Sequence, residues 1–581
     1  MIKIDPIALE LMNNSLSSIT DEMMITTHRT GYSGSIKYLM DFSAALFNAR
    51  GDMIAQGVAL PHHLGAMPGA YQSIMAKFSD EIYPGDLFAL NDPYEGGTHL
   101  PDIYLFKPIF VGEVCVGYAV LMAHHIDVGG RTAGSMAADN TSIHQEGLRL
   151  PPLKLYERGV PNRAVFDIIG KNVRIPDKVF GDLRAQAAAC AIAERGIQAM
   201  VKRHGLETVQ AYWDELLNYT ERMMQKVIGD MPDGSYTFED FVDDDGMTGE
   251  PVRIAVKLDV LGDAVTVDFT GSSPQAKGAI NSTYWYTISC VQAVFRCLVP
   301  PQTPNNAGAF RRIKVIAPEG SFVNPRYPAA VAARGVTGYR IDDAILGALS
   351  KALPGQIPAA SEGGNTSLRM AGSDESGRQF ILMEVVCGSR GGRPTIDGIE
   401  GVNNPTQNLS NTPVEALEAD FPVRVKQYGF VPDTGGAGQF RGGMSLVREW
   451  EYLTDAMLQV RSDRSRFVPW GAQEGCPGTG SENLLNAGSA NEVRLAAKFV
   501  RDVHKGDRFR HITPGAGGYG NPLKRDAQGV LKDVLNGKLS TEYARRVYGV
   551  VLDLANQAVD TQATHAERAR LASHPSAAST A

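Results

Sequence analysis

A short segment that holds one histidine and two aspartates between glycines and prolines is the first candidate for chemistry in this sequence. It reads NDPYEGGTHLPD, residues 91–102, and carries Asp92, His99 and Asp102. The adjacent glycines and the prolines disfavour a helix, so a loop must present His99 and Asp102. Binding and catalytic groups are often carried on loops at strand ends. The segment is therefore expected to be a functional loop.

A second histidine and acid cluster follows in HHIDVGG, residues 124–130. Its histidines end an apolar run that is typical of a strand, and Asp41 stands immediately before another predicted strand. Imidazole and carboxylate are ligands that zinc, manganese and iron accept. The alternative is that these side chains only cap turns through hydrogen bonds. The glycine pairs beside both segments favour a site for one divalent metal ion, formed by Asp41, His99, Asp102 and His124.

Other polar residues near these segments are candidates for supporting roles. For proton transfer the candidates are Asp127, Glu146 and His125, and Glu146 could instead orient a metal-bound histidine. Contact with substrate or with the metal ligands is predicted for His63, Asp92 and His144. For His63, in LPHHLGAMPG, simple loop packing is an equally good interpretation.

The elements that must position these residues can be predicted from local patterns. Asp5 and Pro6 are a helix start, followed by apolar residues at helical spacing. FSAALFNARGDMIAQG predicts a β-hairpin that begins just after Asp41, and DLFALND and VCVGYAVLMAHH predict further strands. An alternating pattern around Gly262 predicts another hairpin. Two helices are predicted after it, near residues 284–298 and 342–353.

The overall prediction is a mixed α/β (α+β) protein of several layers, with mixed β-sheets, a long helical hairpin and a strand-rich C-terminal part. The predicted regions are a metal-site region at 1–170, a helical hairpin packed on the sheet at 171–232, an α/β region that begins with a β-hairpin at 233–375, a strand- and glycine-rich region at 376–556 and a disordered tail at 557–581.

Composition and missing motifs exclude several classes of protein. The 581 residues carry a net charge of -8, so no basic field favours nucleic acid. The sequence shows no secretory signal pattern and no apolar run that could span a membrane, and we expect a cytoplasmic protein. None of the six cysteines forms a CxxC pair, and no GxxxxGK[ST] or GxSxG motif occurs. The glycine-rich segments 433–443 and 513–522 are interpreted as tight turns, so we predict no nucleotide site in this chain.

Six motifs in order resemble the hydantoinase B/oxoprolinase family, over about residues 5–522. The motifs are DFSAALFNARGDMIAQGVALPHHLGAMP, NDPYEGGTHLPDI, HHIDVGG, QEGLRLPPLKLY, NTPVEALEADFPV and TPGAGGYGNP. The last motif has alanine and asparagine where many relatives have glycine and aspartate. The resemblance implies metal ligands at Asp41, His99, Asp102 and His124, the four residues already selected on chemical grounds.

The resemblance also implies an activity and a partner. Such chains act with a hydantoinase A-type subunit that binds ATP and magnesium, so we expect an (αβ)2 heterotetramer. We expect ATP-dependent hydrolysis of a cyclic amide such as a lactam, a hydantoin or 5-oxoproline, with a caprolactam-type lactam as a plausible substrate. The ion is expected to be zinc, with manganese or iron as alternatives, and bicarbonate could take part. Two alternatives remain: a subunit of an ATP-dependent ketone carboxylase of the acetone or acetophenone type, and a structural subunit whose metal only holds loops together.

Overall fold

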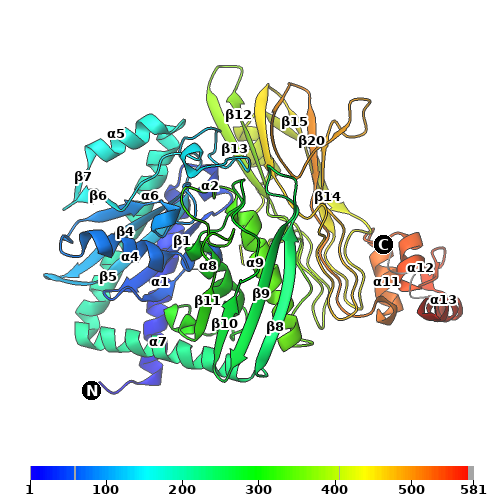
Figure 1. Cartoon of the computed structure of the whole chain (residues 1–581), viewed down its shortest axis with the longest axis horizontal. Helices are drawn as coiled ribbons and strands as arrows, with labels where there is room; N and C mark the ends of the chain where they lie inside the picture. The colour runs from blue at the N-terminus through cyan, green and yellow to red at the C-terminus, as the bar shows by residue number, and fades with distance from the viewer. Residues whose placement is uncertain (1, 58–59, 405, 408, 574–581) are drawn as a thin grey trace.

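The computed structural model of the chain describes residues 2–57, 60–404, 406–407 and 409–573. Figure 1 shows the N-terminal sheet and its helices on the left, a sandwich of strands at the upper right and a group of C-terminal helices at the far right. The composition of 33% helix and 24% strand, in several separate sheets, confirms the predicted mixed α/β class.

A seven-stranded antiparallel sheet forms the N-terminal part of the protein. Its order is β2 (Met53–Gln56), β1 (Phe42–Asn48), β5 (Val114–His124), β4 (Asp102–Val111), β3 (Leu87–Leu90), β6 (Leu153–Glu157) and β7 (Val160–Pro161). The predicted hairpin is present as β1 and β2. Because β1 and β4 run opposite to β5, both begin at the edge where β5 ends. Residues from three strands therefore meet at one edge.

Helices cover both faces of this sheet. α1 (Pro6–Thr30) starts as predicted, with the Asp5 side chain accepting a hydrogen bond from the Ile7 N–H at 2.9 Å. It packs with α6 (Pro176–His204) on the face that carries Phe42, Leu121 and Ile103. α4 (Met67–Phe78) packs on the opposite face. Short helices complete this part: α2 (Gly34–Lys37), α3 (Pro61–Leu64), α5 (Arg163–Asn172), η1 (Pro93–Glu95) and η2 (Ile143–Gln145).

The predicted helical hairpin differs from the structure in its packing. α6 and α7 (Leu206–Gly229) are present and Gly205 alone joins them. Trp213 in the first half of α7 belongs to the core of the first sheet, whereas Met224 and Ile228 belong to the core of the next region. α7 therefore bridges two cores, and only its first half packs as predicted. Apolar spacing gives the face of a helix that is buried and does not identify its partner.

A second sheet has the order β11 (Ile313–Ile316), β10 (Ala264–Asp268), β9 (Val252–Leu261) and β8 (Gly234–Val242). β9 and β10 form the predicted hairpin. α8 (Tyr284–Arg296), α9 (Arg334–Ala352) and η3 (Ala307–Phe310) accompany it. α9 begins at Arg334, although the sequence predicts a start near Asp342. Its first turns contain Gly335 and Gly338, which have poor helix propensity, but almost every residue of α9 is buried, so packing overrides propensity.

Two further sheets pack face to face. One has the order β13 (Gln379–Val386), β12 (Thr366–Ser373), β16 (Ala456–Arg461) and β19 (Lys498–Val503), and the other β14 (Val423–Val431), β15 (Ser445–Tyr452), β20 (Arg508–Ile512), β17 (Glu482–Leu485) and β18 (Val493–Arg494). Leu368 and Leu458 from the first sheet share a core with Trp450 and Phe509 from the second. The predicted strand-rich part is therefore a sandwich, accompanied by α10 (Val414–Asp420).

The glycine-rich segments 433–443 and 513–522 lie against each other as stacked loops, which Figure 1 shows below the sandwich and beside the C-terminal helices. The Gly436 N–H donates to the Ala516 carbonyl at 2.8 Å, and the Gly518 N–H donates to the Cys476 carbonyl at 2.9 Å. A Cβ atom on Gly442 would lie 2.0 Å from the Ala516 oxygen. The glycines are needed because backbone packs directly on backbone.

The predicted disordered tail is wrong for residues 557–573. The chain ends in α11 (Ala527–Leu535), α12 (Thr541–Tyr548) and α13 (Thr561–Ser573), with the strands β21 (Leu552–Asp553) and β22 (Ala558–Val559) and the turn η4 (Pro522–Lys524). Leu571 of α13 is buried, and Arg568 donates to the Tyr548 carbonyl at 3.1 Å. This helix has almost no apolar periodicity and depends on such contacts. The rest of the predicted tail, 574–581, lies outside the described residues.

Candidate metal centre

Three candidate ligands come from the edge where β1, β5 and β4 meet. Asp102 is the direct partner of His124 across β4 and β5, and the His124 N–H donates to the Asp41 carbonyl at 2.9 Å. Directly paired residues of antiparallel strands point to the same face. The three side chains therefore lie side by side on the face that α4 covers.

The loop before β4 supplies His99, and the conformation of this loop requires glycine at position 96. Gly96 has a φ of 101°, and a Cβ atom there would lie 2.3 Å from the Ala70 nitrogen of α4. The Asn91 side chain holds the loop by accepting a hydrogen bond from the Leu150 N–H at 2.7 Å. Gly96 lets the loop lie directly on α4, which brings His99 over the strand edge.

His99, Asp102 and His124 form a compact buried cluster. One ligand atom from each lies within 4.8 Å of the others, and His99 Nε2 is 2.9 Å from Asp102 Oδ1. Both ring nitrogens of His124 are buried and have no hydrogen-bond partner among the described residues. A buried polar group without a partner is costly, and a metal ion would satisfy it. The donor set of two imidazoles and a carboxylate fits a divalent transition metal.

Asp41 and His63 lie on the wall of the same small cavity. Asp41 Oδ1 is 3.5 Å from His63 Nε2, and His63 Nδ1 is 3.1 Å from the Ser43 hydroxyl. Asp41 thus lies beside the three-residue cluster but is not among the residues whose ligand atoms all lie within 4.8 Å of one another. Burial and the charge of Asp102 raise the pKa of Asp41 to about 7.

The protonation states in this cavity suit metal binding. Burial lowers the pKa of His99 to about 4, with Arg334 as a further cause, and lowers the pKa of His63 to about 3. Burial and the neighbouring His99 place the pKa of His124 well below its ordinary value. Neutral imidazoles are the form that coordinates a metal ion.

Arg334, at the start of α9, is a site residue that the sequence did not reveal. Its Nη2 donates to Asp102 Oδ2 and to the Thr98 hydroxyl, the latter at 3.0 Å, and its guanidinium lies 4.2 Å from the centre of the Tyr286 ring. Burial would raise the pKa of Asp102, but His99 and Arg334 hold it well below its ordinary value. Arg334 keeps this carboxylate ionised.

Glu146 acts on the cluster through the backbone. Its Oε1 accepts hydrogen bonds from the Val331 and Ala332 N–H groups, both at 2.8 Å, and the Ala332 carbonyl lies 3.0 Å from His99 Nδ1. Burial raises the pKa of Glu146 to about 8. Glu146 is placed to orient His99, which was one of its two predicted roles.

Two predicted catalytic residues lie outside the cavity. Asp127 binds the Arg174 guanidinium at 2.9 Å and accepts a hydrogen bond from the Gly134 N–H at 3.0 Å. His125 follows His124, so its side chain points to the opposite face of the sheet, where its Nε2 is 3.0 Å from Gln186 Oε1 of α6. The alternation of side chains along a strand separates the two adjacent histidines.

Asp92 and His144 lie in a cluster near the surface, outside the cavity, although Asp92 itself is buried. Asp92 accepts a hydrogen bond from Arg149 Nε at 3.1 Å, and Arg149 Nη1 donates to the Tyr327 hydroxyl at 3.2 Å. His144 is exposed, and its Nε2 is 2.9 Å from the same hydroxyl. Their proximity in sequence to His99 and Glu146 does not bring them to the candidate ligands.

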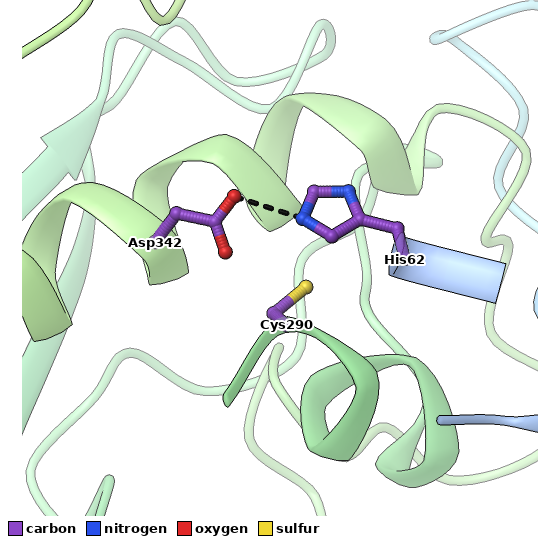
Figure 2. A group of neighbouring side chains, drawn as sticks. All are labelled: His62, Cys290 and Asp342. Atoms are coloured by element: carbon purple, nitrogen blue, oxygen red, sulfur yellow. Dashed lines mark hydrogen bonds and ion pairs between the residues drawn. The ribbon is translucent and has the colours of Figure 1, made fainter. Parts of the chain in front are cut away.

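A second buried group, His62 with Cys290 and Asp342, also places its ligand atoms within 4.8 Å of one another (Figure 2). His62 Nε2 is 2.8 Å from Asp342 Oδ2, and His62 Nδ1 is 3.2 Å from the Tyr286 hydroxyl. Both ring nitrogens of His62 therefore have partners, in contrast to those of His124. The arrangement fits a hydrogen-bonded network that joins Asp342 to Tyr286 on the cavity wall.

The cavity between these groups is small, about 20 Å³, and its wall includes Asn365 and Arg461 in addition to the histidines. Such a volume holds about one water-sized group. The wall thus combines a candidate metal centre with cationic and amide side chains from the sandwich.

Comparisons with known proteins agree over the length of the chain. The family model described as hydantoinase B/oxoprolinase matches residues 5–522. The chain is 34% identical over 568 residues to a putative D-/L-hydantoinase subunit of the B type from Pseudomonas sp. (strain NS671), covering 95% of this chain and 96% of that one. It is 32% identical over 597 residues to the beta subunit of caprolactamase from Pseudomonas jessenii, covering 98% and 100%.

Solved structures show the same fold. The crystal structure of ATP-dependent caprolactamase from Pseudomonas jessenii superposes with a TM-score of 0.91 at 31% identity, covering 98% of this chain and 100% of that one. Nucleotide-free acetone carboxylase also gives a TM-score of 0.91, but at 19% identity, covering 99% and 84%, so it shows the fold alone. The family match over most of the chain, and relatives that align nearly end to end, place this chain in the hydantoinase B/oxoprolinase family.

Proposed function

We propose that this chain is the metal-containing subunit of an ATP-dependent enzyme that opens cyclic amides. The observation that carries this proposal is the buried His124, whose two ring nitrogens lack partners among the described residues, next to His99 and Asp102. These three residues would hold one divalent ion, with Asp41 as a fourth ligand after a small movement. Zinc is favoured, with manganese or iron as alternatives. When bound, such an ion polarises a carbonyl group and lowers the pKa of a bound water.

The residues of the chain prepare this centre. Arg334 keeps Asp102 ionised, and Glu146 orients His99 through the Ala332 carbonyl. Asp127 and His125 are not placed to transfer protons there. The cavity wall offers instead the Tyr286 hydroxyl, which is connected through His62 to Asp342. We propose this chain of groups as the proton carrier.

The partner and the coupling to ATP are supported by the relatives. The hydantoinase and caprolactamase relatives are both named as one subunit of an enzyme, which implies a second chain. For that chain we propose a hydantoinase A-type partner in a cytoplasmic (αβ)2 assembly. ATP and magnesium would bind in the partner, which would activate the amide oxygen by phosphorylation or form carboxyphosphate from bicarbonate. No helix among the described residues of the present chain is long and apolar enough to cross a bilayer.

Ketone carboxylation is the second candidate because acetone carboxylase shares the fold. Its 19% identity is well below the 34% and 32% found for the hydantoinase and caprolactamase relatives, which favours a cyclic amide. Product analysis with labelled bicarbonate separates the two, because only carboxylation retains the label in the product.

The test is metal analysis together with ATP-dependent turnover of the complex. The wild type is compared with His99→Ala and His124→Ala, and His125→Ala is the matched control on the other face of the sheet. The substrate panel contains lactams, hydantoins, 5-oxoproline and ketones. We expect about one metal ion per chain, lost with turnover in the first two variants and kept in the control. Unchanged turnover in folded, metal-free His124→Ala would make this chain a structural subunit and refute the proposal.

A further inference from the structure

The cavity beside the candidate metal centre brings arginine side chains next to the candidate ligands. Arg334 and Arg461 lie on its wall, and Arg369 is near Asp41 and His124. Arg334 is paired with the Asp102 carboxylate. A buried guanidinium group that has no such anionic partner is unfavourable.

Arg369 and Arg461 are poorly satisfied for buried guanidinium groups. Arg369 donates to the Ser367 hydroxyl at 3.0 Å and to the Met383 sulfur at 3.4 Å, and Arg461 donates to the Ala332 carbonyl at 3.3 Å. The Nε atom of each is buried without a partner among the described residues. Among the described residues, neither guanidinium group is hydrogen-bonded to a carboxylate, although a carboxylate is the usual partner of a buried arginine.

The N-terminus of α9 faces the same cavity. This helix has 19 residues, begins at Arg334, and has no side-chain hydrogen bond at its N-cap, Ala333, from any described residue. Helix N-termini carry a partial positive charge and can offer N–H groups to anions. Here the N–H groups of Arg334 and Val336 already donate to backbone carbonyls, at 3.1 and 3.2 Å, and the Gly335 N–H has no partner among the described residues. Next to this turn lies the Asn365 side chain, whose amide oxygen and nitrogen are both buried and without a partner in the described part of the chain.

Gly335 allows this arrangement. A Cβ atom there would lie 2.3 Å from Asn365 Nδ2 and 3.5 Å from Arg461 Nη2. Asn365 itself has a φ of 42°, in the left-handed region that few residues other than glycine adopt. The first turn of α9 and these two side chains are therefore packed closely around one point of the cavity wall.

We propose that Arg461, Asn365 and the N-terminal turn of α9 form an oxyanion-binding site next to the metal centre. The inference rests on the proposed function and specifies its substrate: the group that enters the cavity is anionic. In an ATP-dependent ring opening it is either the phosphoryl group of the activated amide or the carboxylate that ring opening creates. Guanidinium and helix N–H donors recognise both. Because the cavity holds about one water-sized group, a larger head group enters only if the wall moves.

The test measures anion binding at equilibrium and does not need turnover. The complex with its partner is loaded with Mn²⁺, and the paramagnetic relaxation of ³¹P in inorganic phosphate and of ¹³C in formate is titrated. The part of the relaxation that the wild type shows and His124→Ala lacks is assigned to this centre. The variants are Arg461→Gln and Asn365→Ala. The matched control is Arg501→Gln on β19, the strand next to β16.

We expect saturable relaxation of at least one of the two anions in the wild type. The dissociation constant should rise at least tenfold in Arg461→Gln and Asn365→Ala, with unchanged manganese content, and stay unchanged in the control. Binding of phosphate would identify the phosphoryl group as the anion that the site recognises, and binding of formate would identify the carboxylate. No saturable relaxation with either anion, or wild-type affinity in both variants, overturns the site. If Arg461→Gln does not fold, Asn365→Ala alone decides. Failure of the proposed function would instead appear as turnover that persists without metal.

Discussion

Replacement of His124 by leucine should change the stability of the protein in opposite directions with and without metal. The imidazole is buried and both of its nitrogens lack partners in the described structure. A buried unsatisfied polar group costs about 1–3 kcal/mol. Leucine is apolar and of similar size, so His124→Leu should raise the free energy of unfolding of the metal-free protein by about 1–3 kcal/mol.

Metal reverses this order. A ligand present at about 1,000 times its dissociation constant stabilises the folded state by about 4 kcal/mol. The variant loses one of the three clustered candidate ligands and should therefore gain little of this stabilisation by metal. After subtraction of its advantage without metal, the variant should be about 1–3 kcal/mol less stable than the wild type when metal is present.

The assay is thermal unfolding of both proteins, with chelator and with added zinc. The difference between the two midpoints should change sign between the two conditions. The control is His125→Leu, which leaves Gln186 Oε1 without its ring partner and should lower the midpoint by a similar amount in both conditions. If zinc shifts His124→Leu as far as it shifts the wild type, His124 is not a ligand and the reasoning is wrong.

Three further predictions concern Glu146, Asp127 and Gly96. Burial raises the pKa of Glu146 from 4.5 to about 8, so its contribution to stability is complete below about pH 4.5 and is lost as the pH rises to about 8. Glu146→Gln should remove this loss when the free energy of unfolding is measured across that range. An unchanged slope of this free energy against pH would contradict the assignment. Asp127→Ala removes a buried carboxylate from an ion pair with the partly exposed Arg174 and leaves the Gly134 N–H without its acceptor, so it should lower the free energy of unfolding by about 1–3 kcal/mol, while the folded fraction keeps its metal in elemental analysis. Gly96→Ala should reduce the metal content, because the new Cβ collides with the α4 backbone and displaces His99; full metal occupancy would show that the loop can adjust.

Local patterns in the sequence predicted the elements that hold the candidate ligands. Short apolar runs identified β1 and β5, and the glycines and prolines of residues 91–102 identified the loop that carries His99. Since the candidate ligands stand at the ends of these elements, His99, Asp102 and His124 could be selected from chemistry and spacing, whereas Asp41, selected with them, lies beside their cluster. The face of the sheet on which each side chain lies was harder to predict. The sequence does not distinguish His124 from His125, and only the strand pairing shows that they point to opposite faces.

Residues from distant parts of the chain could not be predicted. Arg334 reaches Asp102 across 232 positions, Asn365 lies just before β12, and Arg461 ends β16, both in the sandwich. None belongs to a recognisable motif. The start of α9 was also missed, because Gly335 and Gly338 have low helix propensity and only burial within the folded protein makes that turn stable.

The stacked glycine loops give this protein an interior of a second kind, in which amide groups replace side chains. Here Gly436, Gly442 and Gly518 pack against carbonyl oxygens of neighbouring loops. Hydrogen exchange should therefore find slowly exchanging amides in a region that hydropathy assigns to the surface. Because the layer has no room for a Cβ atom, substitution here is limited by backbone spacing and not by polarity. Two proteins of this family could differ widely in their apolar cores and still need the same glycines.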